Sequence, residues 1–219
     1  MFFCPWRNIS IRLASPVSAP FLRGHGTVPE DLEGVVWRDW LEDVQEAFRD
    51  LKKESSKIFI AGSSMGGDLA MLLSEEKDVS GVISLGTPIE FHFQFLAESA
   101  LRILGAFKTY RRKYYPPWVS KDAIDPRLYP YYPIASAQEV VKLAKYTGEC
   151  LLWVTKPILI AQSTSDHLVS KKSPQIIFDR SSSSQKEIYW VENGHHVFVE
   201  KEEIWKKIED FIKLASQDN

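Results

Sequence analysis

Apolar and polar residues alternate along the chain with two different periods. Short, continuous apolar runs predict four buried strands, at residues 57–62 (KIFIAG), 79–85, 157–162 (PILIAQ) and 187–192 (EIYWVE). Apolar residues at helical spacing predict helices around these runs, at residues 37–51, 65–76 and 137–145, and a final helix that buries Ile204, Trp205, Ile208, Phe211 and Ile212. Strands of this kind that alternate with helices are typical of a mostly parallel sheet with helices on both faces. The pattern therefore predicts an α/β fold, and we expect residues 1–219 to form a single domain.

The segment at residues 88–135 breaks this alternation. It is dense in aromatic and basic residues (FHFQF, KTYRRKYYPPW and RLYPYYP) and is too long for an ordinary connection. We therefore expect a helical cap inserted after the second strand. Interleaved basic and aromatic residues also occur in proteins that bind nucleic acid. A solvated cap surface is the better interpretation because the chain carries little net charge.

The composition excludes several classes of protein. The 219 residues include 27 Lys and Arg against 29 Asp and Glu, a formal net charge of −2, with 44% hydrophobic and 26% charged residues. Disordered chains are less apolar than this, and the balanced charge provides no general attraction for nucleic acid or an anionic membrane. No apolar run approaches the roughly 20 residues that span a bilayer. We expect neither a nucleic-acid partner nor a membrane span.

The N-terminus and the cysteines indicate the compartment. The first aromatic run precedes the first arginine, Arg7, which reverses the order of a secretory signal, so the sequence predicts a cytoplasmic protein. Cys4 and Cys150 are too few and too far apart for a disulfide framework or a zinc ligand set. No metal site is therefore predicted.

A candidate nucleophile, Ser64, follows the first predicted strand. Residues 62–66 (GSSMG) have the pattern GxSxG at a point where a strand turns into a helix. Such an elbow holds its serine in a strained turn, and small residues are needed two positions before and after it because neighbouring backbone crowds them. Gly62 and Gly66 meet this need. The alternative is a glycine-serine turn that merely closes the strand, and the flanking strand and helix favour the elbow.

A serine nucleophile needs a base and an acid, and candidates for both come later in the chain. Asp166 follows the strand at 157–162, and the pair His195 and His196 follows the strand at 187–192. Each lies just beyond the carboxyl end of a predicted parallel strand, where α/β sheets assemble their sites. The order Ser, Asp, His is consistent with a catalytic triad, but spacing alone does not choose between the two histidines.

Four segments together resemble the α/β hydrolase superfamily, and within it the bacterial carboxylesterase and monoacylglycerol lipase group. These segments are FLRGHGTVPEDL (21–32), IAGSSMGGDLA (60–70), KPILIAQSTSDHLVS (156–170) and ENGHHVFVE (192–200). The resemblance implies Ser64 as the nucleophile, Asp166 as the acid and His195 as the base. His195 is preferred because in this group a glycine precedes the base and an acidic residue follows five positions later, here Gly194 and Glu200. His196 stays the alternative.

The oxyanion donors are where the sequence departs from this group. The backbone N–H of Met65, directly after the nucleophile, comes with the elbow and is expected to be one donor. The group's second donor follows a strand that ends in a His-Gly-aromatic motif, and that motif is absent. Either residues 2–6 (FFCPW) are a degenerate version of it or the sequence starts late, and we favour the second explanation. Losing one donor costs about a hundred- to a thousandfold in turnover.

The same departure bears on the sheet. We expect the N-terminal strands to be reduced or missing, which leaves a sheet of about six strands with an exposed edge. An exposed edge favours pairing with the cap or with a second subunit, so a homo-oligomer is one expectation.

The sequence thus predicts a serine hydrolase that cleaves carboxylic esters through an acyl-enzyme, with no metal or organic cofactor. The resemblance implies small ester substrates with short- to medium-chain acyl groups, including monoacylglycerols. Two alternatives stay open. The missing oxyanion motif is consistent with a catalytically weak or inactive binding module of the same fold, and the same triad also serves thioesterases and acyltransferases.

Overall fold

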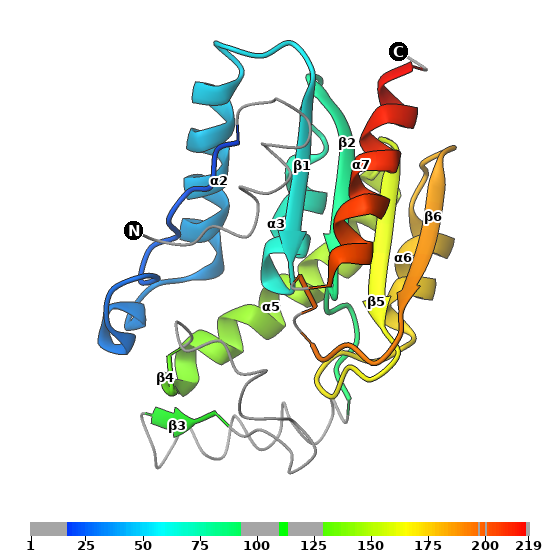
Figure 1. The fold of residues 1–219 in the computed structure, drawn as a ribbon. Coiled ribbons are helices and arrows are strands. Elements are labelled where there is room, and N and C mark those ends of the chain that lie inside the picture. Colours follow the sequence, from blue (N-terminus) through cyan, green and yellow to red (C-terminus); the bar gives the residue numbers. More distant parts are fainter. Residues whose placement is uncertain (1–16, 93–109, 114–128, 197, 200, 218–219) are drawn as a thin grey trace.

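The computed structural model describes residues 17–92, 110–113, 129–196, 198–199 and 201–217 (Figure 1). The elements in chain order are η1 (Pro29–Leu32), α2 (Trp37–Leu51), β1 (Ile58–Ser63), α3 (Met65–Leu73), β2 (Val79–Leu85), β3 (Tyr110–Arg112), β4 (Tyr131–Pro133), α5 (Ile134–Cys150), η3 (Leu151–Trp153), β5 (Ile158–Ser163), α6 (Ser173–Arg180), β6 (Lys186–Val191) and α7 (Glu202–Gln217). No helix in this described part of the chain is long and apolar enough to cross a bilayer.

A parallel sheet in the order β1-β2-β5-β6 forms the centre of the fold. Its two inner strands, β2 and β5, are buried along their whole length, which explains their continuous apolar sequences. Parallel pairing requires each strand to return by a crossover, and helices α3 and α6 provide two of these connections. The carboxyl ends of all four strands therefore lie at one edge of the sheet.

Helices cover both faces of this sheet (Figure 1). On one face, Met71 of α3 and Ile177 of α6 pack against Ile158 and Ile160 of β5. On the other face, α7 packs Ile208 and Phe211 among residues of β2, β5 and β6. Helices α2, α3 and α5 meet in a further apolar cluster around Trp40, Leu69 and Leu143. The predicted α/β architecture with helices on both faces is confirmed.

The strands of the main sheet and the helices around them agree with the predicted ones to within a few residues, except for two helices. The strand at 79–85 has the predicted bounds, and the other three strands are displaced by one residue. The helix predicted at 137–145 extends over Ile134–Cys150, and α6 was not predicted. Helix α6 gives no clear sequence signal, because its eight residues bury only Ser173, Pro174 and Ile177, which are too few to establish a helical period.

In the described part of the chain, β1 is the edge strand of the main sheet. Among the described residues, β1 pairs with β2 alone, so the main sheet has four strands there. A cavity of about 610 Å³ runs beside β1 between Phe48 of α2, Ile212 of α7 and the segment 17–20. Residues 1–16, where the sequence predicted reduced or missing strands, lie outside the described residues. A homo-oligomer that pairs at this edge stays a prediction.

The predicted cap, residues 88–135, lies mostly outside the described residues, including any helices in it. Its described part contains an antiparallel ribbon of β3 and β4. The hydroxyl groups of Tyr110 and Tyr131 donate hydrogen bonds to Glu33 and Glu30, respectively, at either end of η1. The bond to Glu33 raises the pKa of Tyr110 to about 12. These bonds attach the ribbon to the loop that follows the N-terminal segment.

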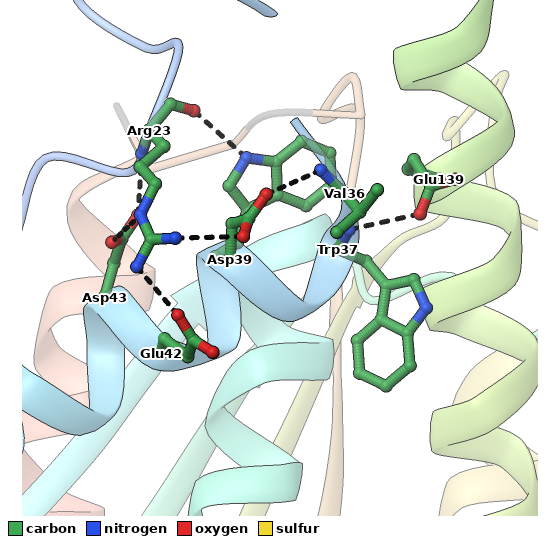
Figure 2. Close-up of polar contacts among 8 residues, drawn as sticks. Arg23, Val36, Trp37, Asp39, Glu42, Asp43 and Glu139 are labelled. Atoms are coloured by element: carbon green, nitrogen blue, oxygen red, sulfur yellow. Dashed lines mark hydrogen bonds and ion pairs between the residues drawn. The ribbon is translucent and has the colours of Figure 1, made fainter. Parts of the chain in front are cut away.

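Two carboxylates cap the N-terminus of α2 (Figure 2). Asp39 accepts a hydrogen bond from the backbone N–H of Val36 at 2.8 Å, and the buried Glu139 of α5 accepts one from the N–H of Trp37 at 3.1 Å. Carboxylates at a helix N-terminus accept hydrogen bonds from its unpaired N–H groups, and their negative charge interacts favourably with the positive end of the helix dipole. Glu139 thereby joins α2 to α5, the two helices that flank α3.

Arg23 connects the preceding loop to the same helix. Its guanidinium contacts carboxylates of Asp39, Glu42 and Asp43 at 2.9, 2.9 and 2.8 Å (Figure 2). Its backbone carbonyl accepts a hydrogen bond from the indole of the buried Trp40 at 3.1 Å. The RGHG segment at residues 23–26 is thus attached to the core through α2.

We expect Glu139→Ala to lower the free energy of unfolding by about 1–3 kcal/mol, because the buried N–H of Trp37 loses its acceptor. The matched control is Glu149→Ala, an exposed position on the same helix, which should change stability by less than about 0.5 kcal/mol. Urea denaturation measures both. Equal effects of the two substitutions would contradict the cap.

Candidate active site

Ser64 lies in the single-residue connection between β1 and α3, and its backbone is strained. Its dihedral angles are φ 53° and ψ −128°, a conformation that residues with a Cβ rarely adopt. The turn is held because the N–H of Ser64 donates to the carbonyl of Leu85 at 2.8 Å, while its carbonyl accepts from Gly67. Strand, strained serine and helix follow one another as the GxSxG pattern predicted.

The two glycines of this pattern contribute differently. A Cβ at Gly62 would lie 1.9 Å from the carbonyl oxygen of Gly66, so no larger residue fits there without displacing backbone. A Cβ at Gly66 would meet no atom within 4 Å. The expectation that backbone crowds both positions is therefore correct for Gly62 and wrong for Gly66, because the tight contact is made by the backbone of Gly66 itself.

His196 lies between Ser64 and Asp166. Its Nε2 is 2.8 Å from Ser64 Oγ, and its Nδ1 is 2.9 Å from Asp166 Oδ2. With the proton on Nδ1, the imidazole donates to the carboxylate and accepts the hydroxyl proton of the serine. The side chain of His196 is 12% exposed and that of Asp166 is fully buried, so the three groups interact with little screening by water.

At the third position the geometry favours the alternative histidine. His195 was preferred as the base, but it is the next residue, His196, whose ring reaches both Ser64 and Asp166. The physical reason is the turn after β6. Asn193 adopts a left-handed φ of 52°, and the carbonyl of Gly194 accepts a hydrogen bond from the buried hydroxyl of Ser163. This turn directs the ring of His196 toward Ser64 and Asp166.

Asp166 is held by four hydrogen bonds. Its Oδ1 accepts from the backbone N–H groups of Leu168 and Val169 at 2.8 and 2.9 Å, and its Oδ2 accepts from His196 and from the side-chain amide of Gln162. Burial raises the pKa of Asp166, but the hydrogen bond and charge of His196 and the two backbone N–H groups outweigh it and hold the pKa below its usual range. Asp166 is thus an ionised carboxylate at neutral pH.

Sequence reasoning missed the supporting residues Gln162 and Ser163. Gln162 donates to the carboxylate of Asp166 at 2.8 Å, and Ser163 orients the turn that carries His196. Both close the strand β5 and are fully buried. Polar residues at the end of an otherwise apolar buried strand were the available signal, because a buried polar group requires a partner.

Met65 is the first residue of α3, directly after Ser64. The first N–H groups of a helix have no acceptor within the helix, so this N–H is free of the α3 hydrogen-bond ladder. Its predicted role as an oxyanion donor stays a prediction. Among the described residues, no group of three or more His, Cys, Asp or Glu side chains is arranged to hold a metal ion.

The comparisons with known proteins identify the family. Residues 17–203 match the family model described as serine aminopeptidase, S33. A thermostable monoacylglycerol lipase of Bacillus sp. (strain H-257) is 32% identical over 186 residues, which are 83% of this chain and 71% of that protein. The chain belongs to the serine aminopeptidase S33 family.

Further relatives of this S33-family chain agree with the assignment. A carboxylesterase of Bacillus subtilis (strain 168) is 22% identical over 187 residues, 84% of this chain and 74% of that protein. A solved structure published with the metagenome-derived lipolytic enzymes LipS and LipT has a TM-score of 0.84 at 25% identity and covers 95% of this chain and 87% of that chain. The predicted resemblance to the α/β hydrolase superfamily is confirmed.

Asp68 is a second buried acid near the elbow, four residues after Ser64 on α3. It is fully buried, and neither of its carboxylate oxygens has a hydrogen-bond partner. Burial raises the pKa of Asp68 well above its usual range. Asp68 therefore differs from Asp166, since its burial favours the neutral acid.

We expect Gly62→Ala to destabilise the protein by at least about 3 kcal/mol, because the added methyl group overlaps the backbone of Gly66. Gly66→Ala is the matched control, and it should be neutral or stabilising by up to about 1 kcal/mol, since the site has space and alanine favours a helix. Thermal denaturation compares the two. A tolerated G62A would show that the elbow does not need this close approach.

We expect Asp68→Asn to stabilise the protein increasingly as the pH rises above the ordinary pKa of an aspartate. In the wild type the folded-state pKa is raised, so the unfolded state releases its proton first and stability falls by about 1.4 kcal/mol per pH unit until the folded-state pKa is reached. Urea denaturation at pH 5 and pH 8 measures the difference. Asp50→Asn, an exposed position, serves as the control. A difference between D68N and wild type that does not change with pH would contradict a neutral Asp68.

Proposed function

We propose that the protein is a serine hydrolase that cleaves carboxylic esters, with Ser64 as nucleophile, His196 as general base and Asp166 as the acid that orients it. The observation that carries the proposal is the position of the His196 ring, with Nε2 at 2.8 Å from Ser64 Oγ and Nδ1 at 2.9 Å from Asp166 Oδ2. A serine hydroxyl becomes a nucleophile when a base in hydrogen-bonding reach takes its proton.

In the first step, Ser64 Oγ attacks the carbonyl carbon of the ester while its proton moves to His196 Nε2. Asp166 stabilises the imidazolium that forms, and it keeps the imidazole in the tautomer with a free Nε2 before the reaction. The tetrahedral intermediate then collapses, the alcohol leaves with the proton of His196, and the acyl group stays on Ser64. In the second step, a water molecule gives a proton to His196 and attacks the acyl-enzyme. The second tetrahedral intermediate then collapses, His196 returns the proton to Ser64 Oγ, and the carboxylic acid is released.

The negative charge of the tetrahedral oxygen needs backbone donors. The N–H of Met65 is the first candidate, because it follows the nucleophile and starts a helix whose dipole favours negative charge at that end. The usual second donor belongs to a His-Gly-aromatic motif that this sequence lacks.

The substrate class follows from the relatives. One of them is named a monoacylglycerol lipase and another a carboxylesterase, and both align with most of this chain. Short- to medium-chain acyl esters and monoacylglycerols are therefore the proposed substrates. No cofactor takes part in the proposed steps.

The test combines a fluorophosphonate probe with a series of p-nitrophenyl esters of increasing acyl length. We expect the wild type to be labelled and to hydrolyse at least one ester, and Ser64→Ala to lose labelling and at least about 10⁴-fold in turnover. Equal labelling of the two proteins would exclude Ser64. A labelled wild type that turns over no ester would instead favour a binding module of the same fold.

The base is tested by separate substitutions of the two adjacent histidines. We expect His196→Ala to reduce turnover by at least about 10³-fold, and His195→Ala to change it by less than about tenfold, because only the ring of His196 reaches Ser64. Binding of an inert ester analogue by both variants shows that the site is intact. The opposite ranking of the two variants would restore His195 as the base.

A further inference from the structure

Gln162 touches the proposed triad without belonging to it. It is the fifth residue of β5, it is 1% exposed, and its Nε2 lies 2.8 Å from Asp166 Oδ2. This is the same oxygen that accepts the Nδ1–H of His196 at 2.9 Å. Two donors therefore share one carboxylate oxygen, one of them the imidazole that must change its charge during the reaction.

The other oxygen, Oδ1, is already occupied by the backbone N–H groups of Leu168 and Val169. Those two bonds come from the loop that carries Asp166 itself, whereas Gln162 comes from the rigid strand β5. A hydrogen bond from a strand fixes the plane of the carboxylate relative to the sheet. It also stabilises the negative charge of Oδ2 with a neutral donor, which weakens the attraction of that oxygen for the proton of His196.

We propose that Gln162 is a positioning residue for the reaction: its amide sets the plane of the Asp166 carboxylate and limits how strongly that carboxylate holds the charged form of His196. The inference rests on the proposed function. With the amide present, the imidazole reaches its neutral, active form at a lower pH than with an unassisted carboxylate. Gln162 would thus widen the pH range of activity on its acid side.

Other titratable groups surround the same pair and must be considered. The loop after β6 carries His195 beside His196, and the loop after β5 carries His167, whose ring centroid is 6.5 Å from that of His196. His92, after β2, also acts electrostatically on His167. The residue directly after β2 is the uncharged Gly86, which packs against this site. These groups are the same in wild type and in Gln162 variants, so a difference between the two proteins isolates the amide.

The test is Gln162→Met, which keeps the length and volume of the side chain and removes its donor. We expect the midpoint of the acid limb of kcat/KM to rise by about 0.5 pH unit. A hydrogen bond to an ionised carboxylate shifts the pKa of that acid by about one unit, and we expect part of this shift to be passed on to the imidazole bound to it. We also expect kcat to fall by about tenfold with KM changed by less than about threefold, because the carboxylate is no longer fixed.

Gln175→Met is the matched control. Gln175 also donates to an aspartate, Asp179, at 2.8 Å, but this bond lies on the exposed surface of α6. It should leave the acid limb unchanged. A second readout without turnover is the titration of the ring protons of His196 by NMR in both variants, and Gln162→Leu replaces the methionine variant if that protein does not fold.

Fluorophosphonate labelling of Ser64 separates the two hypotheses. If the wild type is labelled at Ser64 and a folded Gln162 variant has the wild-type midpoint by both readouts, the positioning role is wrong and the proposed function stands. If kcat falls and the midpoint does not move, Gln162 is only structural, and the inference is again wrong. If Ser64 is not labelled in the wild type, the proposed function itself fails.

Discussion

The site depends on one property of parallel sheets, which is that all their carboxyl ends lie at the same edge. Ser64 follows β1, Asp166 follows β5 and His196 follows β6. The last residues of β1 and β2 are register partners, as are Ser163 and Val191 at the ends of β5 and β6. Side chains separated by more than 130 positions are thereby brought within hydrogen-bonding distance. The helices on both faces keep the strands in place, so the distances at the edge are set by the core.

Two buried aspartates illustrate how the surroundings decide the chemistry of one residue type. Asp166 receives hydrogen bonds from two backbone N–H groups, Gln162 and His196, and its pKa is lowered despite its burial. Asp68 receives none, and burial raises its pKa well above the usual range. The two residues lie in the same α/β core, one beyond the end of β5 and the other on α3. The donors around Asp166 thus favour its anion, whereas the burial of Asp68 favours the neutral acid.

Ser64 combines a strained backbone with a position at the edge of the described sheet. The backbone of Ser64 is held at a positive φ by bonds to Leu85 and Gly67, and Gly62 makes room for the carbonyl of Gly66. On its other side, β1 has no partner strand among the described residues and faces a cavity of about 610 Å³. Ser64, the proposed nucleophile, thus follows an edge strand of the described sheet, which makes the packing of α2 and α7 beside β1 important for its position.

The order of elements, the elbow and the positions of Ser64 and Asp166 could be predicted from the sequence, because they depend on local periodicity and on short motifs that force one backbone conformation. Residues 79–85 form a strand with the predicted bounds, and Ser64 and Asp166 lie where the strand ends placed them. The choice between His195 and His196 depended on the tertiary structure. It is decided by the left-handed turn at Asn193 and by the bond from Ser163 to Gly194, which joins residues 31 positions apart. The support of Asp166 by Gln162 likewise appears only when β5 and the loop beyond it are folded together, since the direction of a side chain at a turn is set by its neighbours in space.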